Sequence, residues 1–429
     1  GSMCGIVAIL LANQDAAVNQ EIYDALTILQ HRGQDAAGMV TSDRRRRLHL
    51  HKDQGFVRDV FKLQQVMKLL GSYGIGHCRY PTAGAQSDVQ EAQPFVTNIP
   101  FGLCLAHNGN ITNTAEVATE LSFRYHCNTD SDSELMLSLI ADQLLNQSHS
   151  PEADPLGPSH FFTAIRGLMS RVRGGYAGVL LINGYGIVAF RDPCGIRPLS
   201  YGCKDVGNGL KDWIAASESV AIESLGYTNL GDVLPGEAVF FPSTPGAPIS
   251  REMCHSAPKL APCIFEYVYF GRPDSVFDGV SVYRSRQLMG SYLADKVRKQ
   301  IGVDVIDVVC PVPDTSRISA LQCALSLGVP YEEGLTKNRY IARTFIMPGQ
   351  KKRAKNVRKK LNPISEVFQG KRVLLVDDSI VRGTTSKQIV SMARDAGASK
   401  VFFCSASPEI RFPNVYGIDM PVQSELVAF

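Results

Sequence analysis

The sequence predicts an α/β protein with two domains, and three observations carry this prediction. The chain has 429 residues, which exceeds the usual size of a single domain. From residue 4 to about 240, short strands and turns interleave with helices, as in stacked sheets covered by helices. From residue 263 onwards, strands alternate with helices, and this order predicts a mostly parallel, doubly wound sheet.

The composition excludes several classes of protein. Hydrophobic residues make up 45% of the chain and charged residues 20%, as in ordinary globular proteins. The net charge of +3 gives no reason to expect nucleic acid or an acidic membrane as a partner. We find no apolar run long enough to span a membrane and no signal-like start, so we expect a cytoplasmic protein. Eleven scattered cysteines without a C-x-x-C pair suggest neither a disulfide framework nor a zinc site.

The start of the chain holds a candidate nucleophile. Residues 1–2 look like the remainder of a cleaved expression tag, which makes Met3 the initiator and Cys4 the first mature residue. A cysteine at a mature N-terminus carries an α-amine with a pKa near ~8, which suits that amine as a general base for the thiol. The apolar run 6–11 predicts a buried strand that anchors Cys4. The ordinary alternative is a packed strand cysteine.

Four motifs follow Cys4, at residues 31–38, 76–82, 107–110 and 131–134. Each motif places hydrogen-bonding groups beside a glycine or a turn. An amino-acid amide such as glutamine needs a cation for its carboxylate, an anion for its ammonium and donors for an oxyanion. Arg79, Asp132 and Asn108 with the Gly109 N–H supply that set.

The helices and connections of the chain follow from periodicity and turn residues. Helices are expected at 20–30 and 133–145, and the arginine run 44–47 is expected at a solvated hairpin tip. Five prolines fall within 241–262, where we place the interdomain linker between domains 4–240 and 263–429. In the second domain, strands are expected at 265–270, 305–309 and 373–376, and a helix at 386–396.

Residues 373–385 join a buried strand, an acidic pair and an anion cradle. Backbone N–H groups that enter the helix after Gly383 favour a phosphate. Asp377 and Asp378 cannot favour a phosphate by charge, so they are expected to bind a sugar diol or a magnesium ion. A sugar phosphate would suit both parts of the segment, with its hydroxyls on the acidic pair and its phosphate in the cradle. The ordinary alternative is a pair of acids that caps a helix, followed by a common turn.

Two segments upstream carry further candidates. Asp314 and Thr315 lie in a turn at a predicted strand end and could hold pyrophosphate or its magnesium ion. Lys337, Arg339 and Arg343 supply cations that suit a highly anionic group, and the resemblance given below for segment 373–385 implies that this group is the pyrophosphate that leaves during the reaction.

The first domain resembles the class II glutamine amidotransferases, the N-terminal-nucleophile family, over about residues 4–240. The resemblance implies a four-layer αββα sandwich in which Cys4 attacks the glutamine carboxamide. It implies an oxyanion hole at Asn108 and Gly109. His31 and His107 are expected to be structural, since the α-amine already fills the base role. The glutamine-binding residues implied are Arg79, Tyr80, Thr82, Asn108, Gly109 and Asp132.

Segment 373–385 resembles the 5-phosphoribosyl-1-pyrophosphate (PRPP) loop of the type I phosphoribosyltransferases. The resemblance implies that Asp377 and Asp378 hold the ribose. It assigns the 5-phosphate to Ser379, Arg382, Gly383, Thr384 and Thr385. It also implies Mg²⁺ as cofactor, at Asp314, Thr315, Asp377 and Asp378.

The two domains in this order resemble the glutamine PRPP amidotransferases, pentosyltransferases that commit PRPP to de novo purine synthesis. The resemblance implies that ammonia passes through an internal channel to PRPP and gives 5-phosphoribosylamine, glutamate and pyrophosphate. It further implies a homotetramer, with allosteric inhibition by purine nucleotides that overlap the PRPP site. The residues that match channel positions are Phe265, Tyr269, Phe345 and Ile346.

The chain departs from the family pattern in three places. Cys263 matches one ligand of the iron–sulfur cluster found in some members, but Asn414 stands at another, so we expect no cluster. The sequence stops at Phe429, short of the usual C-terminal helical tail, so we expect that this tail is either truncated or lies beyond the given sequence. With residues 1–3 attached, Cys4 has no free α-amine, so this form is expected to use ammonia but to be weak or inactive with glutamine.

Two other functions compete with this hypothesis. A transaminating hexosamine synthase shares the first domain, but it should continue into sugar-isomerase domains rather than into segment 373–385. A regulatory protein that binds PRPP without catalysis keeps the cradle, yet it needs neither Cys4 nor the glutamine pocket. Pyrophosphate release from PRPP distinguishes an enzyme from a binding module.

Overall fold

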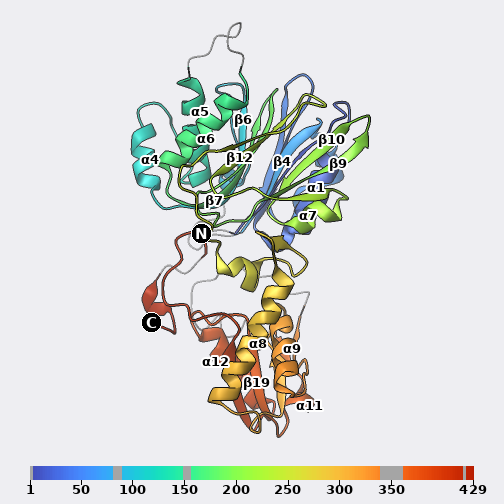
Figure 1. The fold of residues 1–429 in the computed structure, drawn as a ribbon, viewed down its shortest axis with the longest axis vertical. Helices are drawn as coiled ribbons and strands as arrows, with labels where there is room; N and C mark the ends of the chain where they lie inside the picture. The colour runs from blue at the N-terminus through green and yellow to red at the C-terminus, as the bar shows by residue number, and fades with distance from the viewer. Residues whose placement is uncertain (1–2, 81–88, 148–155, 339–360, 419–421) are drawn as a thin grey trace. The chain divides into compact units, whose positions relative to one another are not determined.

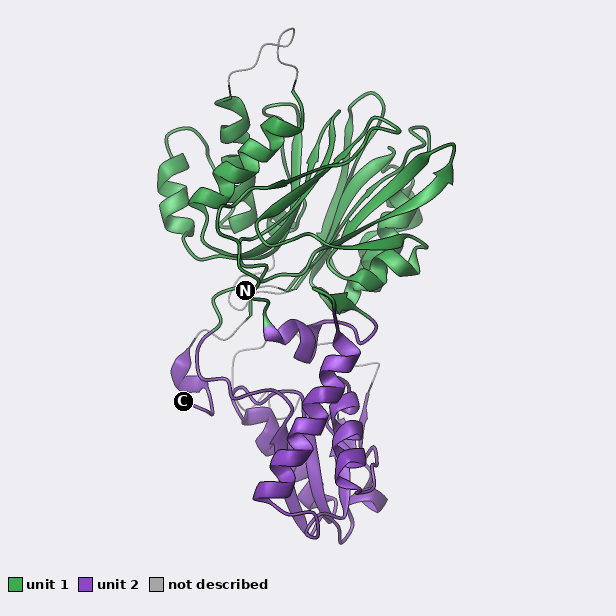
Figure 2. Cartoon of the chain, in the orientation of Figure 1, with its two compact units in different colours: residues 1–263, 275–279, 414–419 green, residues 264–274, 280–413, 420–429 purple. Residues whose placement is uncertain are grey.

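The computed structural model describes residues 3–80, 89–147, 156–338, 361–418 and 422–429. The chain forms two compact units that alternate along the sequence (Figures 1 and 2). Unit 1 comprises residues 1–263, 275–279 and 414–419, and unit 2 comprises 264–274, 280–413 and 420–429.

Unit 1 contains two antiparallel sheets. Within the described part of the chain, the first sheet has seven strands in the order β11-β9-β10-β1-β4-β2-β3. The second has six strands in the order β13-β12-β8-β7-β6-β5. The bounds in the first sheet are β1 Gly5–Leu10, β2 Ala36–Ser42, β3 Leu48–Gln54, β4 Tyr73–Arg79, β9 Ser200–Gly207, β10 Leu210–Ala216 and β11 Thr228–Asp232. Those in the second sheet are β5 Phe95–Thr97, β6 Leu103–Ile111, β7 Gly174–Ile182, β8 Gly186–Arg191, β12 Glu237–Pro242 and β13 Ser250–Met253.

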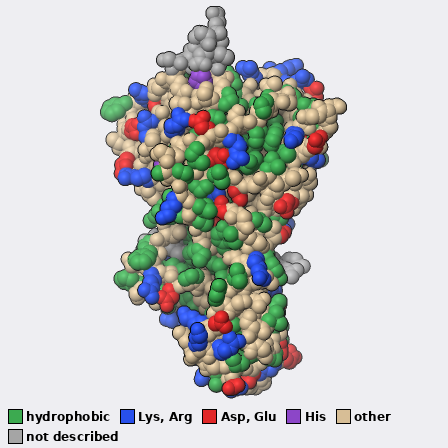
Figure 3. Space-filling view, in the orientation of Figure 1, with side chains coloured by type: hydrophobic (Ala, Val, Ile, Leu, Met, Phe, Trp, Pro, Cys, Tyr) green, Lys and Arg blue, Asp and Glu red, His purple; other side chains and the backbone are tan. Residues whose placement is uncertain are grey.

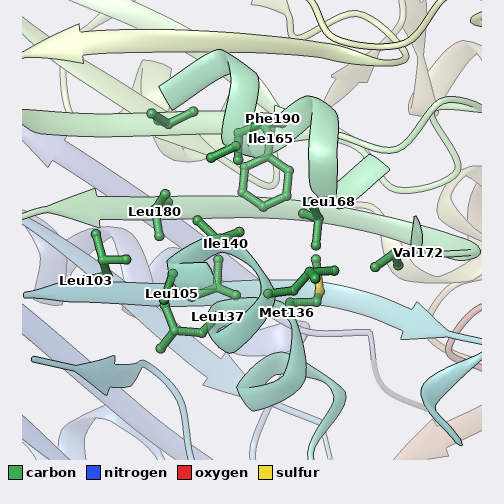
Figure 4. Close-up of a cluster of buried hydrophobic side chains, with 14 of the residues drawn as sticks. Leu103, Leu105, Met136, Leu137, Ile140, Ile165, Leu168, Val172, Leu180 and Phe190 are labelled. Atoms are coloured by element: carbon green, nitrogen blue, oxygen red, sulfur yellow. The ribbon is translucent and has the colours of Figure 1, made fainter. Parts of the chain in front are cut away.

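Three hydrophobic clusters order these sheets and helices into layers. One cluster lies between the sheets and includes Ile6 and Ala8 of β1, while Val7 and Ile9 point into a cluster on the opposite face. Because both faces of β1 are buried, its sequence is continuously apolar rather than alternating. The second sheet packs on its outer face against helices, as Figure 4 shows for Leu180 and the helical residues around it. The four-layer αββα sandwich is confirmed.

The helices of unit 1 cover the outer faces of the two sheets. Those whose residues join the cluster outside the first sheet are α1 Asn19–Ile28, α2 Val57–Val60, α3 Leu63–Val66 and α7 Ser219–Ser224, with η1 Leu29–His31. Those outside the second sheet are α4 Thr114–Leu121, α5 Asp132–Leu145 and α6 Pro158–Arg171. A short helix, η2 Val89–Glu91, and strand β14 Val276–Phe277 complete the unit.

Unit 2 is built on a parallel sheet in the order β16-β19-β20, with bounds Val308–Pro311, Arg372–Asp377 and Lys400–Ser405. Leu374 and Val376 of β19 pack into a cluster with helices α8 Val282–Gln300 and α9 Arg317–Leu327. Val373 and Leu375 pack on the other face with α12 Thr384–Asp395. Helices thus cover both faces, so the doubly wound parallel sheet is confirmed. The other elements are β15 Val280–Ser281, β17 Leu335–Lys337, β18 Leu361–Pro363, α11 Ser365–Phe368 and η4 Gln423–Glu425.

The strand expected at 265–270 is wrong. This segment forms a short π-helix, η3 Glu266–Phe270, closed by a hydrogen bond from the Gly271 N–H to the Glu266 carbonyl. The buried guanidinium of Arg286, on α8, donates to the carbonyls of Tyr267 and Gly271 at 2.8 Å each. These tertiary hydrogen bonds satisfy the backbone in a helical turn, although the residues themselves favour a strand.

Two other boundaries differ from the sequence-based expectations. The strand expected at 305–309 begins at Val308, after a turn closed by the Ile306 N–H and the Val303 carbonyl. The segment 241–262, expected to be a linker, holds β13, which pairs with β12 and belongs to unit 1. The expected hairpin tip at 44–47 is confirmed, because β2 and β3 pair up to Ser42 and Leu48 on either side of it.

The surface of both units carries charges of both signs. On the face shown in Figure 3, basic and acidic side chains are interspersed rather than gathered by sign. Among the described residues, we find no helix with the length and apolar character needed to cross a membrane.

Candidate active sites

Cys4 lies at the entrance to strand β1, in the middle of the first sheet of unit 1. Its side chain is buried, and its backbone N–H donates to Asn108 Oδ1 at 2.9 Å. Gly5 pairs with Cys78 on the antiparallel strand β4, so the next residues, Cys4 and Arg79, come to lie opposite each other. The fold therefore brings the predicted nucleophile to the predicted carboxylate-binding cation.

Asn108 and Gly109 lie on β6, in the second sheet, and Asn108 contacts Cys4 just before the start of β1. Asn108 is fully buried, and its Nδ2 has no hydrogen-bond partner among the residues that the structure describes. Gly109 has a φ of 142°, and a Cβ there would lie 2.0 Å from the Gly175 carbonyl oxygen on β7. A buried, unpaired amide N–H beside a thiol is the arrangement that an oxyanion requires.

Arg79 is held between two carboxylates. Its guanidinium lies 2.5 Å from Glu91 Oε2 and 3.6 Å from Asp35 Oδ2. Burial raises the pKa of Asp35; Arg79 lowers this pKa and the nearby Glu91 raises it. Asp35 lay in a motif of the sequence but was given no role, and Glu91 was missed. Both carboxylates fix the position of the Arg79 guanidinium.

Asp132 begins helix α5, and its carboxylate accepts from the Ile111 N–H, at the end of β6, at 3.1 Å. This contact places the predicted ammonium-binding acid near the oxyanion residues. His107 Nδ1 lies 3.0 Å from Ser133 Oγ, and burial lowers the pKa of this histidine, while Asp132 acts in the opposite direction. Tyr80 follows β4, and Thr82 lies outside the described residues.

The acidic pair of unit 2 lies at the carboxyl end of β19, as the sequence predicts. The Asp378 N–H donates to Asp377 Oδ1 at 2.9 Å, and Ser379 Oγ donates to Asp378 Oδ1 at 2.7 Å. Burial raises the pKa of Asp377, and the neighbouring carboxylate raises it further. Burial also raises the pKa of Asp378, against the hydrogen bonds from Ser379 and Thr315. A cation or hydroxyl donors bound to this pair would therefore stabilise its ionised form.

The predicted phosphate cradle lies at the start of helix α12. Gly383 has a φ of 67°, and Thr384 and Thr385 are the first residues of the helix, which places their N–H groups at its positive end. Arg382 Nε donates to Glu425 Oε2 at 2.6 Å, and the Val427 N–H donates to the Val381 carbonyl. Residues 425–427 thus lie against this loop.

Some of the residues predicted to bind pyrophosphate or its magnesium ion lie close together in the structure. Lys337 Nζ lies 2.7 Å from Asp314 Oδ2, and Arg317 lies 3.2 Å from the other oxygen of that carboxylate. Thr315 hydrogen bonds to Asp378, which joins this turn to the acidic pair. Arg339 and Arg343 lie outside the described residues.

Two of the four candidate channel residues are described. Phe265 is buried just before η3, and Tyr269 packs edge-on against Phe270 with ring centroids 5.0 Å apart. Phe345 and Ile346 lie outside the described residues.

Known proteins match this chain over almost its whole length. Residues 82–224 match the glutamine amidotransferase domain family. The amidophosphoribosyltransferases of Pseudomonas aeruginosa and Pasteurella multocida are each 54% identical to it, cover 99% and 100% of the chain, and are themselves covered to 83%. The chain belongs to the amidophosphoribosyltransferase family.

A solved structure of the Bacillus subtilis glutamine PRPP amidotransferase, complexed with ADP and GMP, matches the fold of this chain. Its TM-score is 0.83 at 36% identity, covering 99% of this chain and 86% of that one. The chain is accordingly an enzyme, a transferase of the glutamine amidotransferase type.

The described residues offer carboxylates to a divalent cation, but they do not include a complete set of ligands. Among the described residues, we find no group of three His, Cys, Asp or Glu side chains placed to hold a metal. Magnesium ions in such enzymes use one or two carboxylates together with substrate phosphates. The raised pKa values of Asp377 and Asp378 fit this arrangement, because a cation would relieve the repulsion between them.

An iron–sulfur cluster does not fit the residue at the position of Asn414. The Asn414 carboxamide oxygen accepts from the N–H groups of Tyr416 at 2.9 Å and Ile418 at 3.3 Å. An asparagine that closes a turn offers no thiolate to iron.

Two residues that were not predicted from the sequence support the backbone of Cys4: Arg32, which donates to the Cys4 carbonyl, and Glu218, which pairs with Arg32. Arg32 and Glu218 are fully buried and in contact with each other. Arg32 lay within a recognised motif without an assigned role. Glu218 lies two residues beyond the apolar end of β10, and a lone charged residue so close to a buried strand is the signal that could have identified it.

Proposed function

We propose that this chain catalyses the glutamine-dependent amination of PRPP to 5-phosphoribosylamine, glutamate and pyrophosphate, the first committed step of purine nucleotide synthesis. The single observation that carries the proposal is the Cys4–Asn108 pair. One carboxamide accepts from the backbone of the nucleophile and keeps its own buried N–H available. The acidic pair and the anion cradle in the same chain supply the acceptor site.

The glutaminase half-reaction follows from the residues around Cys4. In the processed chain the α-amine of Cys4 takes the thiol proton, and the sulfur attacks the carboxamide carbon of glutamine. The oxyanion that forms accepts hydrogen bonds from Asn108 Nδ2 and the Gly109 N–H. The carbon–nitrogen bond then breaks, ammonia leaves with the proton, and water hydrolyses the thioester to glutamate. Arg79 and Asp132 orient the substrate through its carboxylate and ammonium.

The transferase half-reaction follows from the end of β19. Asp377 and Asp378 bind the ribose hydroxyls, and the N–H groups at the start of α12 bind the 5-phosphate. Lys337 binds the pyrophosphate, with Arg339 and Arg343, while ammonia attacks carbon 1 of the ribose and the carbon–oxygen bond to pyrophosphate breaks. Asp314, Thr315, Asp377 and Asp378 would hold Mg²⁺, which when bound neutralises the charge of the leaving group.

The remaining assignments are also proposals. We propose that ammonia travels between the two sites through a channel that includes Phe265, Tyr269, Phe345 and Ile346. Purine nucleotides are proposed as inhibitors, in line with the ADP and GMP bound to the B. subtilis relative. We propose a homotetramer in the cytoplasm; eleven cysteines that form no disulfide within the described part of the chain fit a reducing compartment.

The test is an assay of pyrophosphate and phosphoribosylamine formed from PRPP by protein that begins at Cys4. We expect activity with glutamine and with ammonia, and we expect Cys4→Ala to abolish the first and retain the second. No pyrophosphate release with either nitrogen donor would overturn the proposal. Equal activity of Cys4→Ala with glutamine would overturn the assignment of the nucleophile.

A further inference from the structure

Glu218 is a fully buried carboxylate behind the nucleophile strand. It directly follows Ser217, whose N–H donates to the Ile6 carbonyl at 3.0 Å and whose Oγ accepts from the Ile6 N–H at 2.9 Å. These bonds extend the pairing of β10 with β1 by one residue beyond Ala216 and Val7. Glu218 is therefore fixed beside the start of β1, within unit 1.

The Glu218 carboxylate interacts with Arg32, His31 and Ser275, among other described residues. Arg32 donates to Oε1 at 2.6 Å, His31 Nε2 lies 2.7 Å from the same oxygen, and Ser275 Oγ donates to Oε2 at 2.6 Å. Burial opposes ionisation of this carboxyl, but the charges of His31 and Arg32 and the hydrogen bonds hold its pKa well below its usual range. The carboxylate is thus ionised and held at both oxygens.

Arg32 connects this carboxylate to the nucleophile. The guanidinium is fully buried; its Nη1 donates to Glu218, and its Nε donates to the Cys4 carbonyl at 3.0 Å. On the other side of the same residue, the Cys4 N–H donates to Asn108. Arg32 and Asn108 therefore hold the two backbone groups of Cys4, and the orientation of Arg32 depends on Glu218.

Ser275 belongs to a short segment that is firmly attached to unit 1. The Val276 N–H donates to Ser219 Oγ at 2.9 Å, and Asp278 pairs with Arg191 through both oxygens at 2.7 and 2.9 Å. Ser275 and Phe277 are buried. Segment 275–279 thus delivers the Ser275 hydroxyl to Glu218 from a part of the sequence far from the motifs around Cys4.

We propose that Glu218 is a positioning residue for the glutaminase reaction: it orients Arg32, and through Arg32 the backbone of Cys4, with the Ser275 hydroxyl holding the carboxylate in place. The proposal rests on the proposed function of Cys4 as nucleophile. Neither Glu218 nor Ser275 touches the substrate, so both act on the rate of attack rather than on glutamine affinity.

The test uses the full chain beginning at Cys4, with Glu218→Gln, Ser275→Ala and the double variant. Glutamine conserves the size of the side chain and removes its charge. Glu218→Gln should lower kcat with glutamine about 10- to 100-fold, because the loss of a hydrogen bond to a charged group corresponds to a rate change of this size. Ser275→Ala should lower kcat about threefold to tenfold. In both variants, KM for glutamine and the ammonia-dependent rate should stay within about twofold of the values for the unsubstituted chain. The double variant should match Glu218→Gln within about twofold, because Ser275 acts through Glu218.

Matched controls separate positioning from packing. Glu237 is a buried carboxylate of unit 1 that pairs with Arg251, on the second sheet, and Ser42 is a buried serine that donates to Asn183. Glu237→Gln and Ser42→Ala should keep the wild-type kcat. A diazoketone analogue of glutamine, which alkylates Cys4, gives a second measurement. The Glu218→Gln protein should be labelled slowly but to full stoichiometry.

Each outcome decides the proposal. Partial labelling of Glu218→Gln would indicate a misfolded site and overturn a positioning role, as would a wild-type kcat or multiplicative effects in the double variant. If the unsubstituted chain itself lacks glutamine-dependent activity, the proposed function fails. If that chain is active and Glu218→Gln equals it, only the inference about Glu218 fails.

Discussion

At the scale of the residue, Asp377 and Asp378 form a buried carboxyl pair with unfavourable electrostatics. A bound cation or bound hydroxyl groups would reduce this electrostatic cost. Two adjacent carboxyls at the end of a buried strand repel each other, and burial deprives them of water. The same pair is placed to meet hydroxyls or a cation. The repulsion and burial of these two carboxyls therefore destabilise the folded state locally, as is common where titratable groups gather in a binding site.

Replacement of Asp377 by Asn should stabilise the unliganded chain at neutral pH. The folded pKa of Asp377 is raised above its unfolded value near ~3.9, so its contribution to stability is complete below that pH and is lost as the pH rises through the folded pKa. An asparagine cannot ionise, and its Oδ1 can still accept from the Asp378 N–H.

We therefore expect Asp377→Asn to raise the melting temperature of the unit 2 transition by roughly 2–4 °C at pH 8, a shift equivalent to about 1 kcal/mol, and to leave it unchanged near pH ~4. Turnover of PRPP should fall at least tenfold. Thermal unfolding over this pH range checks the result, with the exposed Asp304→Asn as control. A variant less stable than the parent at pH 8 would contradict it.

At the scale of the element, the oxyanion site depends on how closely β6 and β7 approach. Gly109 pairs with Tyr176, and the space that a Cβ would need is occupied by the Gly175 carbonyl and the Tyr176 Cα. Position 109 therefore requires glycine for two reasons: a side chain would clash with β7, and the φ of 142° is unfavourable for other residues. The backbone of this one residue sets the direction of an N–H donor.

Gly109→Ala should abolish glutamine-dependent activity, by at least ~100-fold, because the backbone of β6 must move at the oxyanion site. The ammonia-dependent reaction should persist. Gly231→Ala is the matched control: Gly231 has a φ of 119°, but no described atom lies within 4 Å of the position that its Cβ would take. This variant should lose roughly 1 kcal/mol of stability and keep the activity. Equal losses of glutamine activity in both variants would show that backbone strain alone is responsible.

At the scale of the whole molecule, the two units have separate hydrophobic cores. Three clusters of the described residues lie in unit 1, and two lie in unit 2. A chain with separate cores need not unfold in a single cooperative transition. The residues proposed for the glutaminase site belong to unit 1, and the described residues proposed to bind PRPP belong to unit 2.

We expect calorimetry to resolve two transitions that respond to different ligands. PRPP with Mg²⁺ at ~100 times its Kd stabilises the unit that binds it by about 2.7 kcal/mol, which should raise one transition by roughly 5–10 °C. Covalent modification of Cys4 by the glutamine analogue should shift the other transition. A single transition shifted by both ligands would contradict the independence of the two cores.

Much of the molecule could be predicted from the sequence because its signals are local. The apolar run at β19, the acids that follow it and the glycine at the start of α12 all lie within segment 373–385. Strand, turn and helix cap are determined there by neighbouring residues. The motifs around Cys4 were recognisable for the same reason.

Contacts between residues far apart in the chain could not be predicted and became apparent only from the folded structure. Segment 265–270 has the composition of a strand, and Arg286 on α8 stabilises it as a π-helix. Glu218 reaches Arg32 across 186 positions, and Ser275 reaches Glu218 across 57. No periodicity or spacing encodes such pairs, because a buried charge selects its partners only after the chain has folded around it.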